Sequence, residues 1–327
     1  MRTFTFKSLF LTVLFVLLGS LAIQAADDGL ITEQITIKLD KAGTLPNSIS
    51  ESQKYLITNL KIVGKVNGTD WKLIRNMAGS DFYGRETGGK LSILDLSEAK
   101  IVAGGSAYVS YYGDWYTSND KIGDNAFYGC SGLTSITLPS GVTWIGGYAF
   151  DGCSGLTSLT LPSSLTEISY CAFSGCSGLT SLTLPSGVTK IGGYAFSGCS
   201  GLTSLTFPSG VTEIGDHAFY DCSGLTSIYV YAEKMPKLGT NMFGGCDAKK
   251  CTVYVPKGTY DDYWLSEFGY FENIVEFEAT GINNVITSND AKELSRYSVN
   301  GQRLSAPTKG LNIVKYSDGS VKKVAVQ

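Results

Sequence analysis

The sequence predicts a solenoid, in which similar coils stack and each coil adds one short strand to a parallel β-sheet. Three observations predict this fold class. A block close to IGGYAFSGCSGLTSLTLPSGVTK recurs from Ile122 to about Ser227, its cysteines keep a constant spacing of 23 residues, and its leucines follow the pattern LxxLxLP. The repeated cysteines are Cys130, Cys153, Cys176, Cys199 and Cys222. Because a single unit cannot bury its own apolar face, neighbouring units must stack.

The first segment, residues 1–25, has the pattern of a secretory signal peptide. Arg2 and Lys7 precede an apolar run from Leu9 to Leu18, and small residues follow. The run is shorter than the roughly 20 residues that a membrane-spanning helix needs, which argues against a retained anchor. We therefore expect an exported protein, at the cell surface or extracellular, with no transmembrane span in the mature chain.

The composition is that of a folded chain with few charges. Of its 327 residues, 43% are hydrophobic and 17% are charged, and the formal net charge is −3. Binding to nucleic acid depends on basic side chains that displace counterions from phosphates. This charge balance therefore argues against a nucleic-acid partner.

Residues 26–120 are interpreted as an N-terminal cap built from degenerate repeats, because the open end of a solenoid must be covered. The segments NLKIVG and LSILDLS resemble the regular strand. Their apolar positions are Leu60, Ile62, Leu91, Leu94 and Leu96. Between Ile101 and Asn119, an insertion rich in Gly, Tyr and Trp interrupts the periodicity.

Residues 121–277 are predicted to hold the regular coils and a C-terminal cap. Strand alternation in LTSLTLP directs Leu156, Leu159 and Leu161 into the core. It directs Ser158 and Thr160 outward onto a concave face. The other wall of the core consists of Ile168, Ala172, Phe173 and Cys176. The convex side has room for turns and single helical turns.

An aromatic segment after the last repeat predicts the C-terminal cap, with a functional aromatic platform as the alternative. Its rings are Tyr260, Tyr263, Trp264, Phe268, Tyr270 and Phe271. The remaining residues, 278–327, predict a small antiparallel β module. Asn300-Gly301 and Asp318-Gly319 are each flanked by alternating apolar residues, which is the sequence pattern of a hairpin turn.

The chain has a single histidine, His217. It occupies a repeat position that holds Asn125, Tyr148, Cys171 and Tyr194 in other coils. A solitary imidazole argues against a histidine-based zinc site, and no nucleophile-elbow motif is present to pair it with a serine. We therefore expect no enzyme activity, no catalytic residue, no metal site and no cofactor.

The repeated cysteines are expected to be buried free thiols. Equivalent Cα atoms of stacked coils lie about 4.8 Å apart, and parallel Cβ atoms at this spacing exceed the roughly 3.8 Å of a disulfide. A buried thiol then acts as a small hydrophobe. Because export permits disulfides, the pairing of Cys246 with Cys251 stays open, as does the redox state of Cys171.

A column of charged residues precedes the isoleucine of the coils. Glu167, Lys190 and Glu213 alternate in sign on adjacent coils. We interpret this column as surface support for the register, in which each ion pair contributes about 1 kcal/mol or less.

Two surfaces are candidates for binding, and the first is the concave hydroxyl face. Its residues are Ser135, Thr137, Ser158, Thr160, Ser181, Thr183, Ser204, Thr206, Ser227 and Tyr229. Weak contacts along such a repetitive face accumulate for an extended partner. The alternative is a solvated hydroxyl ladder that β propensity alone favours.

The second candidate surface is the aromatic insertion. Its residues are Tyr108, Tyr111, Tyr112, Trp115 and Tyr116. Tyr and Trp mixed with Gly and Ser are typical of adaptable recognition loops. The alternative is that these rings only cover the first regular coil.

The repeat IGxxAFxxCxxLxxLxLPxxVTx closely resembles the BspA-like leucine-rich repeats of surface and secreted proteins from Gram-negative anaerobes. Five consecutive units keep Ile, Ala, Phe, Cys and Leu in register. The segment YSVNGQRLSAPTKGLNIVKYSDGSVKKVAVQ is similar to C-terminal sorting modules of such bacteria. The resemblance implies adhesion to host or bacterial surface proteins, and it carries over no catalytic residue.

The sequence thus predicts a capped leucine-rich-repeat solenoid. We infer an exported, non-enzymatic surface adhesin or protein-binding module, monomeric, secreted or held at the cell outer membrane, whose partner is an extracellular host or bacterial surface protein. A structural spacer or display scaffold is one alternative. Glycan binding in nutrient uptake is another, for which only the insertion offers aromatic platforms.

Overall fold

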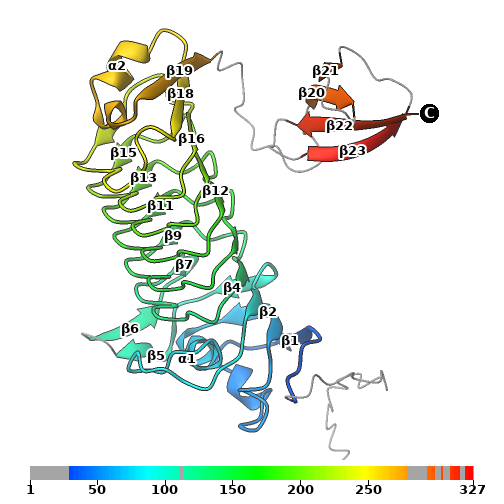
Figure 1. Cartoon of the computed structure of the whole chain (residues 1–327). Coiled ribbons are helices and arrows are strands. Elements are labelled where there is room, and N and C mark those ends of the chain that lie inside the picture. Colours follow the sequence, from blue (N-terminus) through cyan, green and yellow to red (C-terminus); the bar gives the residue numbers. More distant parts are fainter. Residues whose placement is uncertain are drawn as a thin grey trace, which may run out of the picture.

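The computed structural model (Figure 1) describes residues 29–110 and 113–277, and the backbone of further strands between residues 293 and 326. The predicted secretory signal lies outside the described residues, as do Tyr111 and Tyr112 of the insertion. From β1 to β19, the coils stack into one elongated array. The predicted fold class, a leucine-rich-repeat solenoid with parallel strands, is confirmed.

The N-terminal region starts the array with parallel strands and one helix. These elements are β1 (Ile35–Leu39), a 3-10 turn (Leu45–Asn47), β2 (Asn59–Val66), α1 (Gly68–Met77), β3 (Ile93–Asp95) and β4 (Ala99–Ile101). α1 begins at a capping box of Asn67 and Asp70, which satisfies free N–H groups at the helix start. Leu60, Leu94 and Ile136 are buried in register on β2, β3 and β8, so these strands continue the register of the regular coils.

Each regular coil contributes one strand to a parallel sheet, whose outward side we call the strand face. The strands are β8 (Ser135–Thr137), β10 (Ser158–Thr160), β12 (Ser181–Thr183), β14 (Ser204–Phe207), β16 (Ser227–Val230), β18 (Thr252–Pro256) and β19 (Asn273–Phe277). They belong to two sheets, the first ending at β10 and the second starting at β12. Leu159 on β10 and Leu161 just after this strand are half-buried and pack against the core.

A second parallel sheet of two-residue strands runs along another side of the coils. Its strands are β7 (Lys121–Ile122), β9 (Trp144–Ile145), β11 (Glu167–Ile168), β13 (Lys190–Ile191), β15 (Glu213–Ile214) and β17 (Lys237–Leu238). Between these strands the chain runs in turns, as expected, in which some backbone N–H groups bond to the carbonyl three residues earlier, as Cys153 N does to Phe150 O at 3.1 Å. Other backbone N–H groups of the turns bond to the next coil. Phe150 N, for example, donates to Ala172 O at 2.7 Å.

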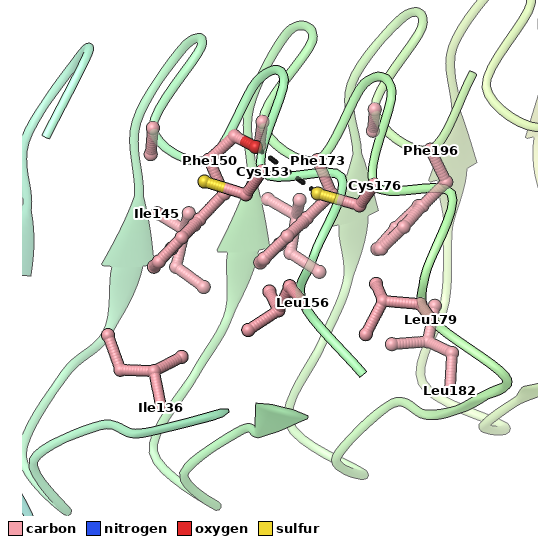
Figure 2. Packing of buried hydrophobic residues seen from close by; sticks show 14 of the residues in the cluster. Ile136, Ile145, Phe150, Cys153, Leu156, Phe173, Cys176, Leu179, Leu182 and Phe196 are labelled. Carbon is pink, nitrogen blue, oxygen red and sulfur yellow. Dashed lines mark hydrogen bonds between the residues drawn. The ribbon is translucent and has the colours of Figure 1, made fainter. Parts of the chain in front are cut away.

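The core between the two sheets is a stack of near-identical layers (Figure 2). Phe150, Phe173 and Phe196 are fully buried, and successive rings stack with centroids 4.9 and 5.2 Å apart. Beside them, the Cys176 thiol donates to the carbonyl oxygen of Phe150 at 3.2 Å. One layer therefore both packs against and hydrogen-bonds to the layer before it.

The C-terminal cap closes the array after β18. It consists of α2 (Tyr260–Trp264), a 3-10 turn (Glu267–Tyr270) and the edge strand β19. Tyr263, Phe268 and Phe271 are buried, and the Tyr263 hydroxyl donates to Ala232 O at 2.7 Å. These three rings confirm the predicted cap. The rings of Tyr260, Trp264 and Tyr270 stay exposed.

The last strands form a separate antiparallel sheet in the order β21-β20-β22-β23. Their bounds are Glu293–Ser298 for β20, Arg303–Leu304 for β21, Gly310–Tyr316 for β22 and Val321–Val326 for β23. The antiparallel pairing agrees with the hairpin pattern of the sequence. The turn dipeptides Asn300-Gly301 and Asp318-Gly319 themselves lie outside the described residues.

Among the helices that the structure describes, none has both the length and the apolar composition to cross a membrane.

Candidate functional site

The strand face carries two columns of small hydroxyl side chains in register. Ser181, Ser204 and Ser227 lie opposite one another on β12, β14 and β16. Thr183 and Thr206 form the neighbouring column, and the hydroxyl residues on β8 and β10 repeat this pairing. The serine and threonine positions are exposed or half-buried, whereas the leucine or isoleucine between them faces the core. The predicted outward direction of these hydroxyl residues is confirmed.

The threonine column ends in a stacked tyrosine pair. Tyr229 follows Thr206 in register, and Tyr254 and Val275 continue the column on β18 and β19. The Tyr229 and Tyr254 rings stack with centroids 4.6 Å apart and an interplanar angle of 7°, and Val275 is 45% exposed. Burial, together with the neighbouring tyrosines, raises the pKa of Tyr229. The face therefore ends in a neutral apolar patch.

Sequence reasoning identified Tyr229 but missed Tyr254 and Val275. The repeat length changes after Cys222, so simple counting no longer places these residues in the column. The signal that could have found them is the alternation in CTVYVP, where Tyr254 lies two residues after Thr252, as Tyr229 lies two residues after Ser227.

Charges are absent from the strand face between β8 and β19, although the Thr137 column continues on β3 and β2 of the same sheet into the ion pair of Asp95 and Lys61, at 3.5 Å. The outward columns from β8 to β19 contain Ser, Thr, Tyr, Asn and Val, without Lys, Arg, Asp or Glu. On the second sheet, Glu213 pairs with Lys190 at 3.8 Å and with Lys237 at 3.7 Å. Glu167 lies in register beside Lys190. The predicted alternation of sign on adjacent coils is confirmed.

The aromatic insertion forms a hairpin of β5 (Gly104–Ser110) and β6 (Asp114–Thr117) next to α1. Tyr108 is 1% exposed, and Trp115 packs partly buried against the core. The expectation of an exposed Tyr108 ring is therefore wrong. Tyr116, in contrast, is 55% exposed. The candidates Tyr111 and Tyr112 lie outside the described residues.

Tyr108 is buried because it helps to cap the first coil. In the later coils, carbonyl oxygens of the turn accept hydrogen bonds from backbone N–H groups of the preceding coil. Ala149 O, for example, accepts a hydrogen bond from Phe127 N. The first coil has no regular predecessor, and side chains take that place. The Tyr108 hydroxyl donates to Asp124 O at 2.7 Å, and Trp71 Nε1 donates to Ala126 O at 3.3 Å.

Arg75 completes this cap by donating to backbone carbonyl oxygens. Its guanidinium is fully buried and donates to Asn125 O at 2.5 Å, to Ala126 O at 2.9 Å and to Ser80 Oγ at 3.1 Å. Burial lowers the pKa of Arg75, and backbone carbonyl dipoles support the charge in the place of a carboxylate. We assign Arg75 to the cap and not to a binding site.

The lone histidine stacks on a tyrosine. The His217 and Tyr194 ring centroids are 4.6 Å apart, with an interplanar angle of 3°. Within residues 29–110, 113–277 and the later described strands, no group of three His, Cys, Asp or Glu side chains is placed to hold a metal ion. We therefore base no catalytic or metal function on His217.

The cysteines of the coils are free and buried, as predicted. Cys246 and Cys251 are also free, as is Cys171. Desolvation raises the pKa of the Cys130 thiol to about 11 and that of the Cys199 thiol to about 12. Thiols with such pKa values remain protonated near neutral pH and are poor nucleophiles.

The comparisons with known proteins point to one family. The model of the BspA type leucine rich repeat region matches residues 120–250 in six copies, whereas no curated protein matches the chain. A leucine-rich repeat protein of T. pallidum is 31% identical, with 42% of this chain and 68% of that chain covered and a TM-score of 0.34. A leucine-rich repeat protein of Bacteroides ovatus is 23% identical, with 52% and 62% covered and a TM-score of 0.25.

A leucine rich cell surface protein of Faecalibacterium prausnitzii is 18% identical, with 76% of this chain and 88% of that chain covered and a TM-score of 0.32. The family assignment rests on the repeat model and on the repeated layers of Ile, Phe, Cys and Leu in the core. The repeat region of this chain, residues 120–250, belongs to the BspA-type leucine-rich repeat family.

Proposed function

We propose that this chain is an exported, non-enzymatic protein-binding module of the adhesin type, which holds a surface or extracellular protein on its strand face. The observation that carries the proposal is the uncharged strand face that ends in the stacked pair Tyr229 and Tyr254. The repeat family supports a protein-binding role in general.

The chemistry of the strand face resembles the centre of a protein interface. Such centres are depleted in charged residues and enriched in tyrosine. Hydroxyl groups at every coil supply hydrogen bonds to a partner, and Tyr229 and Tyr254 supply buried area with few side-chain rotations to restrict. Weak contacts repeated over adjacent coils add up to a useful affinity.

A structural spacer is the competing function, and the chemistry of the face gives a direct test. A charge pair placed on the strand face must lose hydration when a partner docks, so the variant Thr183→Lys/Thr206→Glu should weaken binding about tenfold or more. The matched control is Ser186→Lys/Ser209→Glu, at exposed positions of the same two coils but in turns outside the strand face.

Binding of the purified chain to panels of extracellular-matrix and plasma proteins is measured by biolayer interferometry. We expect saturable binding to at least one protein, lost in the strand-face variant and kept in the control. Equal binding by both variants would remove the strand face as the site. An absence of binding across the panels would contradict the proposal and favour the spacer.

A further inference from the structure

A continuous ladder of aromatic rings follows the second sheet, away from the strand face. Tyr148 and Tyr170 have ring centroids 5.6 Å apart, and Tyr170 and Tyr194 have centroids 5.7 Å apart, with interplanar angles of 67° and 65°. His217 then stacks on Tyr194. We call Tyr148, Tyr170, Tyr194 and His217 the aromatic ladder, which places one ring on each of four consecutive coils.

The ladder is continuous although the repeat sequence is not. In the other coils the ring follows a glycine pair or Gly-Asp, but the third coil reads Ser169-Tyr170-Cys171. Cys171 occupies the usual ring position and is 8% exposed. Tyr170, one residue earlier, supplies the ring instead. The shift hides the ladder from a comparison of equivalent sequence positions.

Tyr170 lies against the backbone of the next coil with part of its ring open to solvent. A Cβ atom at Gly193 would be 3.4 Å from Tyr170 Cδ2 and 3.6 Å from Cε2, which is van der Waals contact distance. Tyr170 is 48% exposed and Tyr148 is 39% exposed. The open surface of these rings is a platform on which a flat apolar group can stack.

The backbone at three ladder positions is strained. Tyr148, Tyr194 and His217 have φ angles of 56°, 55° and 56°, a left-handed conformation that disfavours bulky side chains. The two ends of this repeat position, Asn125 and Asn241, carry the residue type that tolerates this conformation. Bulky residues held in strained conformations cluster at functional sites. Three of the four central coils thus keep an aromatic ring where asparagine would suit the backbone better, and the other coil has Cys171 there with a φ of 52°.

The charges around the ladder are of both signs, but Lys190 and Lys237 of the second sheet are paired with Glu213. Burial, then Cys171 and to a smaller extent the nearby carboxylate of Asp151, raise the pKa of Tyr148. Asp216 precedes His217 and accepts hydrogen bonds from the Thr240 backbone N–H and hydroxyl. These carboxylates disfavour sialylated, sulfated or uronic-acid ligands and leave neutral ones.

We propose that the aromatic ladder binds a neutral polysaccharide, which lies along the stacked coils with sugar rings on the open surfaces of Tyr148 and Tyr170. The C–H groups of a pyranose face match the negative face of an aromatic ring. The rings repeat once per coil, a spacing comparable to one hexose unit of an extended chain. This site is separate from the strand face and independent of the proposed protein binding.

Ring stacking could instead serve only to hold the coils together, and one variant separates the two roles. Tyr148→Asn/Tyr194→Asn removes two rings and introduces the residue found at both ends of this repeat position. If the ladder binds polysaccharide, this variant should lose polysaccharide binding. Its Tm should stay unchanged or rise, because the substitution relieves strained backbone. A purely structural ladder predicts a lower Tm. Tyr170→Ala provides a second test of binding.

The experiment measures binding of the purified chain to mannan, laminarin, cellohexaose and maltohexaose, with polygalacturonate as the acidic comparison. We expect binding to at least one neutral probe, weakened about tenfold or more in both ladder variants and unchanged in Tyr229→Ala/Tyr254→Ala. Binding to none of the neutral probes would overturn the proposal, and so would loss in the strand-face variant alone. Loss of a protein partner in the ladder variants would reassign the ladder to protein binding.

Discussion

At the scale of single residues, the cysteines of the repeat are donors as well as small hydrophobes. The thiols of Cys153, Cys199 and Cys222 donate to the carbonyl oxygen of the phenylalanine in the coil before, at 3.1, 3.3 and 3.2 Å. This hydrogen bond explains why cysteine recurs at a buried position where an apolar alanine could also be accommodated. Each thiol connects two coils without a covalent bond.

These thiols make stability depend on pH in the alkaline range. The pKa of Cys199 and that of Cys246 are raised to about 12 by burial, whereas an unfolded thiol titrates at about 8.5. Above that pH the unfolded chain releases protons that the folded chain retains. The free energy of unfolding should therefore fall from pH 8 to pH 11.

Urea denaturation followed by circular dichroism at several pH values measures this effect. Because tyrosine also titrates near pH 10, the control is a chain with Cys199→Ala and Cys246→Ala, whose pH dependence should be shallower. An identical slope in the two chains would show that the buried thiols do not govern it.

At the scale of elements, the N-terminal cap replaces a missing coil with side-chain donors. Removing one donor leaves a carbonyl oxygen unpaired. Tyr108→Phe should therefore lower the free energy of unfolding by about 1 kcal/mol, because Asp124 O loses the hydroxyl at 2.7 Å. Tyr116→Phe, at an exposed position of β6 in the same hairpin, should leave the free energy of unfolding unchanged.

Chemical denaturation of the two variants beside the parent chain provides the measurement. Equal stability of all three would mean that water satisfies the Asp124 carbonyl as well as Tyr108 does. A loss in Tyr116→Phe as large as that in Tyr108→Phe would assign the effect to the hairpin as a whole.

The predictions from sequence succeeded where the repeat is regular. The inward leucines, the hydroxyl columns and the free cysteines follow from strand alternation and constant spacing, both of which are local properties. The second sheet was missed because two-residue strands such as Trp144–Ile145 carry no alternation of their own. Hydrogen bonds to neighbouring coils define them.

The candidate binding residues were harder to predict, for two physical reasons. The burial of Tyr108 depends on contacts with residues far along the chain, and composition alone marked it as a surface residue. The aromatic ladder was hidden because Tyr170 reaches the ring column from the position before Cys171. Three-dimensional register, and not sequence register, decides which rings meet.

At the scale of the whole molecule, the solenoid separates its surface chemistries by side. The strand face is neutral and ends in Tyr229 and Tyr254, whereas the second sheet carries the Lys190, Glu213 and Lys237 ion pairs and the ladder. Stacking of near-identical coils extends each chemistry along the array. A protein partner and a polysaccharide could therefore be bound at the same time.

The central claim, that a protein partner docks on the strand face, is tested most directly by hydroxyl-radical footprinting of the chain alone and with that partner bound. Because the strand face and the aromatic ladder both carry tyrosine rings, one experiment measures the oxidation rate on each of these two surfaces. We predict slower oxidation of Tyr229 and Tyr254 in the complex, with Tyr148 and Tyr170 oxidised at the same rate as in the free chain. Protection of Tyr148 and Tyr170 with Tyr229 and Tyr254 unaffected would contradict the claim.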